Sequence, residues 1–120
     1  MKKIYILIVS LFVVFSTNAQ SGLLAGTGFA PNFTVTDING TSHTIYDYLD
    51  SGYVMVLELI SVTCGHCQQH AAGTENSYQT NGPNGNNLAR FLGLEVNATT
   101  NNAAVANFAS VYSVSFPIAN

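Results

Sequence analysis

The residues that surround one cysteine pair constrain the fold of this chain more than any other feature. Residues 53–62 form a nearly continuous apolar run that only Glu58 interrupts. Such a run is typical of a strand in a parallel sheet that is buried on both faces. Residues 64–78 follow almost at once, contain no proline and predict a helix. The sequence therefore places Cys64 and Cys67 where a buried strand ends and a helix begins.

Strand and helix signals alternate along the rest of the chain. Residues 33–38 alternate apolar and polar side chains, and Asn39-Gly40 is a strong hairpin signal, so residues 41–44 are expected to return as the partner strand. The alternation predicts an α/β domain with a central sheet flanked by helices. The remaining expected elements are a helical turn over 45–49, a polar loop over 80–87, a core strand over 88–96, a helix over 103–112 capped by Asn101 or Asn102, and an extended segment over 114–116 before Pro117.

The spacing of Cys64 and Cys67 points to chemistry rather than to a structural crosslink. A disulfide between them closes a very short loop and would stabilise the fold little, because the entropic gain grows with loop length. A close Cys-x-x-Cys pair is more often redox-active or metal-binding. Free N–H groups and the positive end of the helix dipole should lower the pKa of Cys64 below about 8.5. Cys67, one turn further on, could then displace a mixed disulfide formed at Cys64.

Two ionisable residues near the pair are further candidates for catalysis. Burial of the Glu58 carboxylate among apolar neighbours should raise its pKa, and such a carboxyl could exchange a proton with Cys67. The alternative is that Glu58 faces solvent at an edge of the strand. An imidazolium at His66 would stabilise the Cys64 thiolate and make the disulfide a better oxidant. The alternative is an exposed loop histidine.

The motif resembles a known family. Cys-Gly-His-Cys at 64–67 looks like the active site of protein disulfide isomerases, and in that family and in thioredoxin a buried acid stands at the position of Glu58. Residues 30–35 and 37–40 resemble the opening of TlpA-like and AhpC/TSA-type thioredoxin proteins, and residues 112–117 resemble the approach to the family's cis-proline. The resemblance covers residues 29–118.

What the resemblance implies is specific. It implies a thioredoxin-like fold, disulfide exchange with protein thiols and disulfides, a redox-active Cys64–Cys67 disulfide, and no cofactor. It also implies that Phe116 and Pro117 bind the substrate, with Pro117 in the cis form. One departure is Thr63, where the family usually has tryptophan. Another is that the strand after the cis-proline, its partner and the last helix are missing, so the domain, residues 20–120, is expected to be incomplete at its C-terminus.

The N-terminal segment predicts export. Residues 1–19 read as a signal peptide, with Lys2 and Lys3 before a twelve-residue apolar segment and small residues before the cleavage site. The apolar segment is shorter than the ~20 residues needed to span a bilayer. The alternatives are a buried N-terminal helix and an uncleaved anchor. The expected location is the periplasm or the exterior, where a membrane redox partner could exchange electrons with the protein.

Charge excludes one class of partner. Without residues 1–19, Arg90 is the single strong base against six acids. Nucleic-acid binding requires a basic face, which this composition cannot supply.

Metal binding is the main alternative function. Cys64, Cys67 and His70 lie on consecutive turns of the expected helix, and His66 lies four residues before His70. Two thiolates and an imidazole could hold zinc or copper. Copper-delivery proteins on this fold usually add a distant histidine, for which His43 is the one available residue.

Three other readings are weaker or excluded. A peroxiredoxin would need proline at position 57, which is leucine, and covalent haem attachment would need histidine at position 68, which is glutamine. A binding module that keeps a redox-inactive disulfide is the third.

Overall fold

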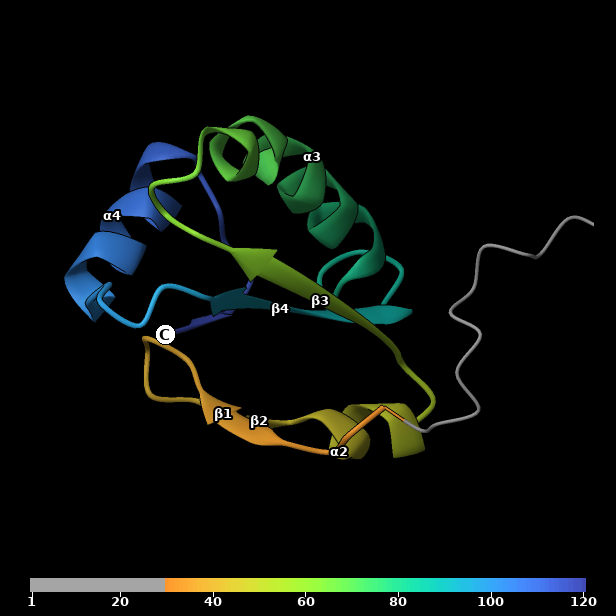
Figure 1. Cartoon of the computed structure of the whole chain (residues 1–120). Helices are drawn as coiled ribbons and strands as arrows, with labels where there is room; N and C mark the ends of the chain where they lie inside the picture. The colour runs from red at the N-terminus through yellow and green to blue at the C-terminus, as the bar shows by residue number, and fades with distance from the viewer. Residues whose placement is uncertain (1–29) are drawn as a thin grey trace, which may run out of the picture. The chain divides into compact units, whose positions relative to one another are not determined.

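The computed structural model describes residues 30–120, whose folded unit is Pro31–Asn120. The predicted signal peptide over residues 1–19 and the start of the predicted domain at residue 20 fall outside the described residues. Within residues 30–120, no helix has the length and apolar character needed to cross a membrane. The elements in chain order are β1 (Thr34–Thr36), β2 (Ser42–Thr44), α2 (Ile45–Asp50), β3 (Val54–Ile60), α3 (Gly65–Asn81), β4 (Ala89–Glu95), α4 (Asn102–Val111) and β5 (Ile118–Ala119) (Figure 1).

The predicted hairpin is confirmed, with shorter strands than the pattern suggested. β1 and β2 pair antiparallel, and Thr34 lies opposite Thr44. The turn between them is held by Asp37, whose Oδ1 accepts the N–H groups of Asn39 and Thr41, both at 2.9 Å. Gly40 adopts φ 88°, a left-handed conformation that glycine tolerates without strain. The hairpin thus depends on the local turn chemistry that the sequence displays.

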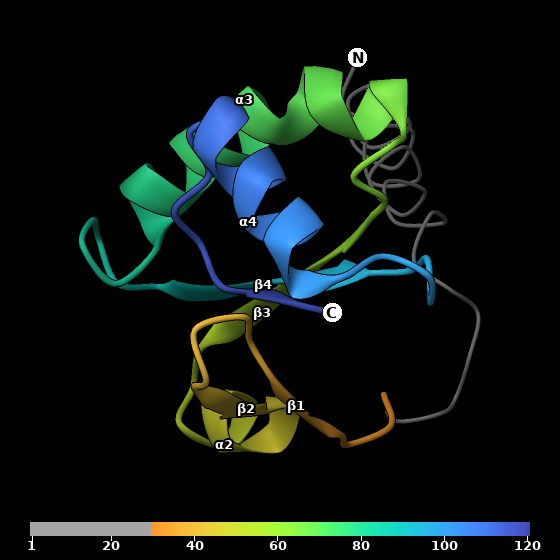
Figure 2. The same ribbon diagram turned by 90° about the vertical axis from the view of Figure 1, so that its left-hand side faces the viewer.

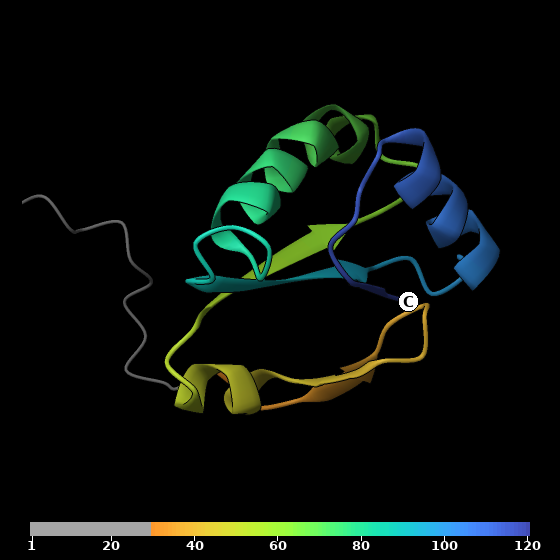
Figure 3. The ribbon, with the colours of Figure 1, turned by 180° about the vertical axis from the view of Figure 1, so that it is seen from behind.

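A second sheet forms the centre of the fold. Its strands are all parallel and lie in the order β3-β4-β5, joined by the crossover helices α3 and α4. Both helices cover one face of the sheet, and the hairpin and α2 lie against the other (Figures 2 and 3). This arrangement confirms the predicted α/β class with a central sheet flanked by helices.

Each face of the central sheet has its own apolar core. The core under the helices is centred on Ile60, Phe91, Val105 and Phe108. The core under the hairpin is smaller and contains Ile45, Leu92 and Ala119. Strands of the central sheet thus carry buried side chains on both faces wherever the helices or the hairpin cover them. This is the pattern expected for parallel strands.

The expectation that β3 is buried on both faces is wrong. Leu57 is 42% exposed and Leu59 is 68% exposed. Both side chains lie on the face that the hairpin covers, but only Met55 from that face of β3 packs into the smaller core. Among the described residues β3 is also an edge strand of its sheet. An apolar run of residues indicates that the segment forms a strand. It does not indicate which faces of that strand are covered by other parts of the fold.

The segment around Pro117 differs from the expectation in two ways. No peptide bond is cis in residues 30–120, so Pro117 is trans, the form favoured by about 0.5–1 kcal/mol. A short strand, β5, follows it directly, and Ile118 lies opposite Gly93 of β4. The strand that follows this proline in the family was expected to be missing, and the two-residue strand β5 lies at that place in the chain. The strand is defined by its pairing with β4.

Candidate active site at the start of helix α3

A tight turn carries the chain from β3 to the cysteine pair. β3 ends at Ile60, and the N–H of Cys64 donates to the carbonyl of Ser61 at 2.9 Å. Cys64 is the N-cap residue of α3, with an extended backbone, and its carbonyl accepts the N–H of Gln68 at 3.1 Å. The predicted position of Cys64 at the start of a helix after a core strand is therefore confirmed.

Two side chains hold the backbone of Val62 in this turn. Glu95 Oε2 accepts the Val62 N–H at 2.9 Å, and the Gln68 side chain donates to the Val62 carbonyl at 2.9 Å. Glu95 Oε1 also accepts the N–H of Asn97 at 2.9 Å. Glu95 was not among the site residues predicted from the sequence. The available signal was its position at the carboxyl end of β4, because the carboxyl ends of neighbouring parallel strands meet at one edge of the sheet.

The environment of Cys64 stabilises its thiolate. The backbone N–H of Cys67 makes the largest contribution to lowering the pKa of Cys64, followed by the Cys67 side chain and the backbone N–H of His66. These donors belong to the first turn of α3, where backbone N–H groups have no partner inside the helix. Both cysteines are free thiols in this structure. The helix start thus supplies the anion-stabilising donors that a nucleophilic sulfur requires.

Cys67 is shifted in the opposite direction. A hydrogen bond from the Ser61 backbone favours its thiolate, but burial, the side chain of Cys64 and the charge of Glu58 together outweigh that bond and raise the pKa of Cys67. The two sulfurs therefore differ in acidity although they lie one helical turn apart. The Cys64 thiol therefore loses its proton at lower pH than the Cys67 thiol.

Glu58 lies on the face of β3 that packs against α3. Its Oε1 accepts the hydroxyl of Thr74 at 3.2 Å, while its buried Oε2 has no hydrogen-bond partner among the described residues. Burial raises the pKa of Glu58, and the hydrogen bond from Thr74 and the charge of His70 only partly offset this effect. Glu58 is thus half-buried, and burial shifts its pKa in the direction expected from the sequence. The charge of Glu58 is one of the causes that raise the pKa of Cys67.

The other predicted site residues lie in different surroundings. The His66 side chain is exposed on the first turn of α3, and its effect on Cys64 comes through its backbone N–H. Phe116 is buried and its ring packs edge-on against Tyr78, at a centroid distance of 6.0 Å. Tyr78 lies fourteen residues after Cys64, so with the 1.5 Å rise of a helix it is roughly 20 Å away along α3. The structure therefore brings Glu58 to the cysteine pair, but it places Phe116 and Pro117 beside the far half of α3.

The residues considered for a metal do not form a ligand set. Within residues 30–120, no group of three or more histidine, cysteine, aspartate or glutamate side chains is arranged to hold a metal ion. His43 instead lies in the hairpin, where its Nε2 donates to Asp37 Oδ2 at 3.0 Å and its Nδ1 accepts the Tyr48 hydroxyl at 2.7 Å. Its two ring nitrogens are thus occupied by structural hydrogen bonds.

Comparison with known proteins gives structural matches only. No protein-family model and no curated protein matches the chain. Among solved structures, a secreted disulfide oxidoreductase from Mycobacterium tuberculosis, homologous to E. coli DsbE, aligns at 22% identity and a TM-score of 0.60. A proposed protein disulfide isomerase from Bacteroides thetaiotaomicron aligns at 25% identity and 0.61. A thiol:disulfide interchange protein of the thioredoxin family from Chlorobium tepidum aligns at 17% identity and 0.62.

These matches establish the fold. They cover 73%, 75% and 75% of this chain and 59%, 54% and 57% of the respective neighbours. The chain thus spans somewhat more than half the length of each of these neighbours. It has the thioredoxin-like fold that the sequence resemblance implied, and these neighbours are thiol–disulfide oxidoreductases.

Proposed function

We propose that this chain is an exported thiol–disulfide oxidoreductase that exchanges disulfides with protein substrates through Cys64 and Cys67. The observation that carries the proposal is the position of Cys64 as the N-cap residue of α3 after β3, with Cys67 one helical turn further on. A lowered pKa gives an attacking thiolate at Cys64, and a raised pKa holds the proton on Cys67 until it must react. The spacing of the cysteines and the thioredoxin-like fold support the same assignment.

The proposed reaction transfers two electrons from the cysteine pair to a substrate disulfide. The Cys64 thiolate attacks one substrate sulfur, so a Cys64–substrate disulfide forms and the other substrate sulfur leaves as a thiolate. The Cys67 thiol then gives its proton to the Glu58 carboxylate and attacks Cys64 Sγ, which releases the second substrate thiolate. The protein ends with a Cys64–Cys67 disulfide and the substrate with two thiols. The same steps in reverse oxidise a substrate dithiol.

His66 and the cellular setting belong to the same proposal. A protonated His66 side chain would add positive charge near Cys64 and favour the reduced form of the pair. Residues 1–19 support export, to the periplasm or the exterior. There a membrane redox partner would restore the pair to its starting state.

Trapping of mixed disulfides tests the assigned roles. Replacement of Cys67 removes the sulfur that resolves the intermediate, so Cys67→Ser should accumulate disulfides between Cys64 and substrate proteins. Cys64→Ser removes the attacking sulfur and should trap few. The measurement is non-reducing electrophoresis of proteins from the exported fraction, followed by reduction. Equal trapping by the two variants would contradict the roles given to Cys64 and Cys67.

A further inference from the structure

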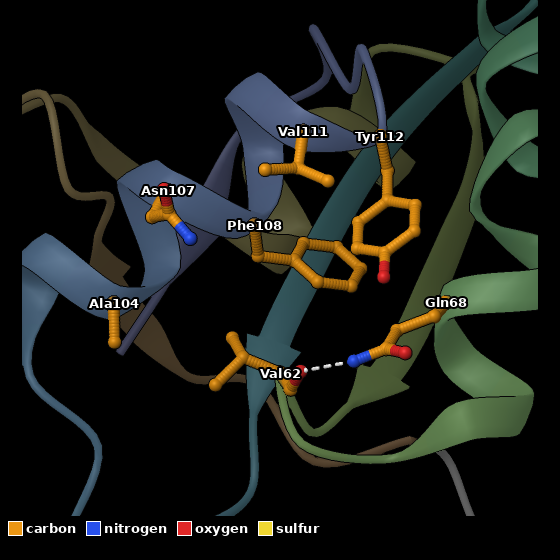
Figure 4. Close-up of a pocket in the computed structure, with 7 residues that line it drawn as sticks. All are labelled: Val62, Gln68, Ala104, Asn107, Phe108, Val111 and Tyr112. Carbon is orange, nitrogen blue, oxygen red and sulfur yellow. Dashed lines mark hydrogen bonds between the residues drawn. The ribbon is translucent and has the colours of Figure 1, made fainter.

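A pocket of about 180 Å³ lies where β4 begins, and neither cysteine lines it. Its wall is mostly apolar and is formed by residues from both layers that cover the central sheet. The lining residues include Tyr48 of α2, Tyr78 of α3, Pro83 in the loop after α3, Arg90 and Phe91 of β4, and Pro117. Arg90 distinguishes this wall, since two other pockets, one of them shown in Figure 4, have no charged side chain in theirs.

Arg90 supplies a positive charge that no acid neutralises in the described part of the chain. It is the only lysine or arginine among residues 30–120, and it is half-buried. The one ion pair within those residues joins His43 to Asp37, and Asp37 does not line the pocket. A cation in a recess with apolar walls attracts anions more strongly than one on an open surface, because the walls focus its field. The pocket therefore favours an anion although the chain as a whole is acidic.

The contacts of the Arg90 guanidinium leave one of its edges available. Its carbon lies 3.6 Å from the centroid of the Tyr53 ring, which covers one face of the cation. Nη1 donates to Asn87 Oδ1 at 2.9 Å and to the Ala89 carbonyl at 3.0 Å, so both of its N–H groups are used. Nε and Nη2 have no acceptor among residues 30–120. The N–H groups of these two nitrogens form a planar fork that matches the two oxygens of a carboxylate.

The rest of the pocket matches a small, flat, apolar body. Tyr78 and Phe91 meet edge to face, with 5.5 Å between their ring centroids. The Tyr48 hydroxyl donates to His43 Nδ1 at 2.7 Å, so its proton is already used. Drug-sized ligands occupy pockets of about 300–1,000 Å³, so this pocket takes a smaller molecule. A single ring that carries a short acidic group has the required size and shape.

We propose that this pocket binds a small aromatic carboxylate. Both carboxylate oxygens accept N–H groups of Arg90, from Nε and Nη2, and the ring lies against Tyr78 and Pro117. Charge-assisted pairs of this kind are roughly twice as strong as neutral hydrogen bonds, and aromatic rings favour contact with one another. The inference goes beyond the proposed disulfide exchange and depends on neither cysteine, because Tyr78 is roughly 20 Å from Cys64 along α3.

Three probe molecules separate the charge of the ligand from its ring. Benzoate has both, benzyl alcohol has the ring without the charge, and acetate has the charge without the ring. Each is titrated into the parent chain at neutral pH, and amide chemical shifts are followed by NMR. Benzoate should bind with a Kd of about 1 mM or lower and shift the signals of Tyr78, Arg90 and Phe91, but not those of Cys64 and Cys67. Benzyl alcohol and acetate should each bind at least about tenfold more weakly.

Variants of Arg90 test the role of the guanidinium. Arg90→Gln removes the charge and should weaken benzoate binding by at least about tenfold. Arg90→Lys keeps the charge but lacks the planar fork, so it should also bind benzoate more weakly than the parent chain. Ala103→Glu, at an exposed position of α4 outside the pocket, lowers the net charge by the same amount as Arg90→Gln and should leave the Kd unchanged. Circular dichroism shows whether each variant keeps the helix content of the parent chain.

The comparison of probes uses the parent chain alone, so it remains decisive even where an Arg90 variant does not fold. Equal affinities for benzoate and benzyl alcohol would overturn the proposal, as would benzoate-induced shifts confined to residues outside the pocket. Unchanged benzoate binding by Arg90→Gln or Arg90→Lys would show that the carboxylate does not pair with the guanidinium fork. An equal loss of binding in Ala103→Glu would show that net charge, and not this pocket, determines the affinity.

Discussion

Glu95 Oε2 accepts the backbone N–H of Val62 at 2.9 Å, so the last residue of β4 holds the chain two residues before Cys64. The second oxygen of the same carboxylate accepts the N–H of Asn97 at 2.9 Å. One side chain thus fixes two loops that follow neighbouring strands. The turn before Cys64 thus depends on a residue that lies far from the cysteines in the sequence.

Replacement of Glu95 should loosen this turn. Glu95→Ala removes both acceptors, and hydrogen bonds to a charged group contribute about 1.5–3 kcal/mol each. Because the carboxylate is partly exposed, we expect the free energy of unfolding to fall by about 2 kcal/mol in total, measured by urea denaturation followed by circular dichroism. Glu95→Gln keeps one acceptor and should lose about half as much. If Glu95→Ala is as stable as the parent chain, the Val62 contact does not hold the turn.

The acidity of Cys64 should depend on the side chain at position 67. The Cys67 side chain contributes to the lowered pKa of Cys64 through a hydrogen bond. Cys67→Ala removes that donor and should raise the pKa of Cys64, while the larger contribution of the backbone N–H at position 67 remains. Cys67→Ser retains a donor and should raise the pKa of Cys64 less. The measurement is the rate of iodoacetamide alkylation as a function of pH, and the same midpoint in both variants would contradict the assignment.

The local part of the fold could be predicted from the sequence. The Asn39-Gly40 turn, the capping of α4 and the strand that leads into Cys64 each depend on residues within a few positions of one another. The Asn101 side chain, for example, accepts the N–H of Ala104 at 2.9 Å and caps α4 as expected. These features depend on backbone preferences that a short stretch of sequence determines by itself.

The other features of the fold and of the site depend on contacts between segments that are distant in the sequence. Leu57 and Leu59 are exposed because of the strand order and the limited reach of the hairpin, neither of which can be inferred from the apolar run. Pro117 resembled a family position by its neighbours in sequence, but its place beside β4 follows from the pairing of Ile118 with Gly93. Glu95 was overlooked because an acid at the end of a strand is common, and only the fold brings it to Val62.

Glu58→Gln should slow the second half of the proposed exchange. The carboxylate is proposed to accept the Cys67 proton, and general bases typically accelerate such steps by about 10²–10⁴-fold. We expect the Cys67 attack on a preformed Cys64 mixed disulfide to slow by about 100-fold, whereas formation of that disulfide should change little. Rapid mixing with the thionitrobenzoate disulfide of 2-mercaptoethanol, followed by acid quenching and mass analysis, separates the two steps. An unchanged second step would remove Glu58 from the mechanism.

Glu58 should also give stability a specific dependence on pH. Burial raises its pKa in the folded state above the usual 4.5, so folding favours the protonated form. Its contribution to stability is therefore fully present below the unfolded pKa and is lost as pH rises through the folded pKa. Glu58→Gln should remove this loss and gain stability relative to the parent chain as pH increases. Thr74→Val removes the hydrogen bond that lowers the pKa of Glu58 and should move the loss to higher pH. Identical pH profiles for all three proteins would contradict the burial of Glu58.

Glu75 should show the opposite dependence. Burial alone would raise its pKa, but the backbone and hydroxyl of Ser115 donate to its carboxylate, at 2.7 and 2.5 Å, and these and weaker hydrogen bonds lower the pKa below the usual 4.5. The contribution of Glu75 is present above the unfolded pKa and is lost as pH falls through the folded pKa. These bonds join α3 to the turn before β5, so they hold the last strand against the helix layer.

Glu75→Gln keeps one acceptor but removes the charge, and we expect a loss of about 1–2 kcal/mol near neutral pH. The difference between the two proteins should shrink toward zero as pH falls below the unfolded pKa and through the lower pKa of Glu75 in the folded state. Asp50→Asn removes an exposed acid from the end of α2 and serves as the matched control. Urea titrations at several pH values measure the free energy of unfolding of the parent chain and of the two variants. A difference that stays constant down to pH 3 would show that the charge of Glu75 does not hold the turn, and that the neutral side chain alone joins β5 to α3.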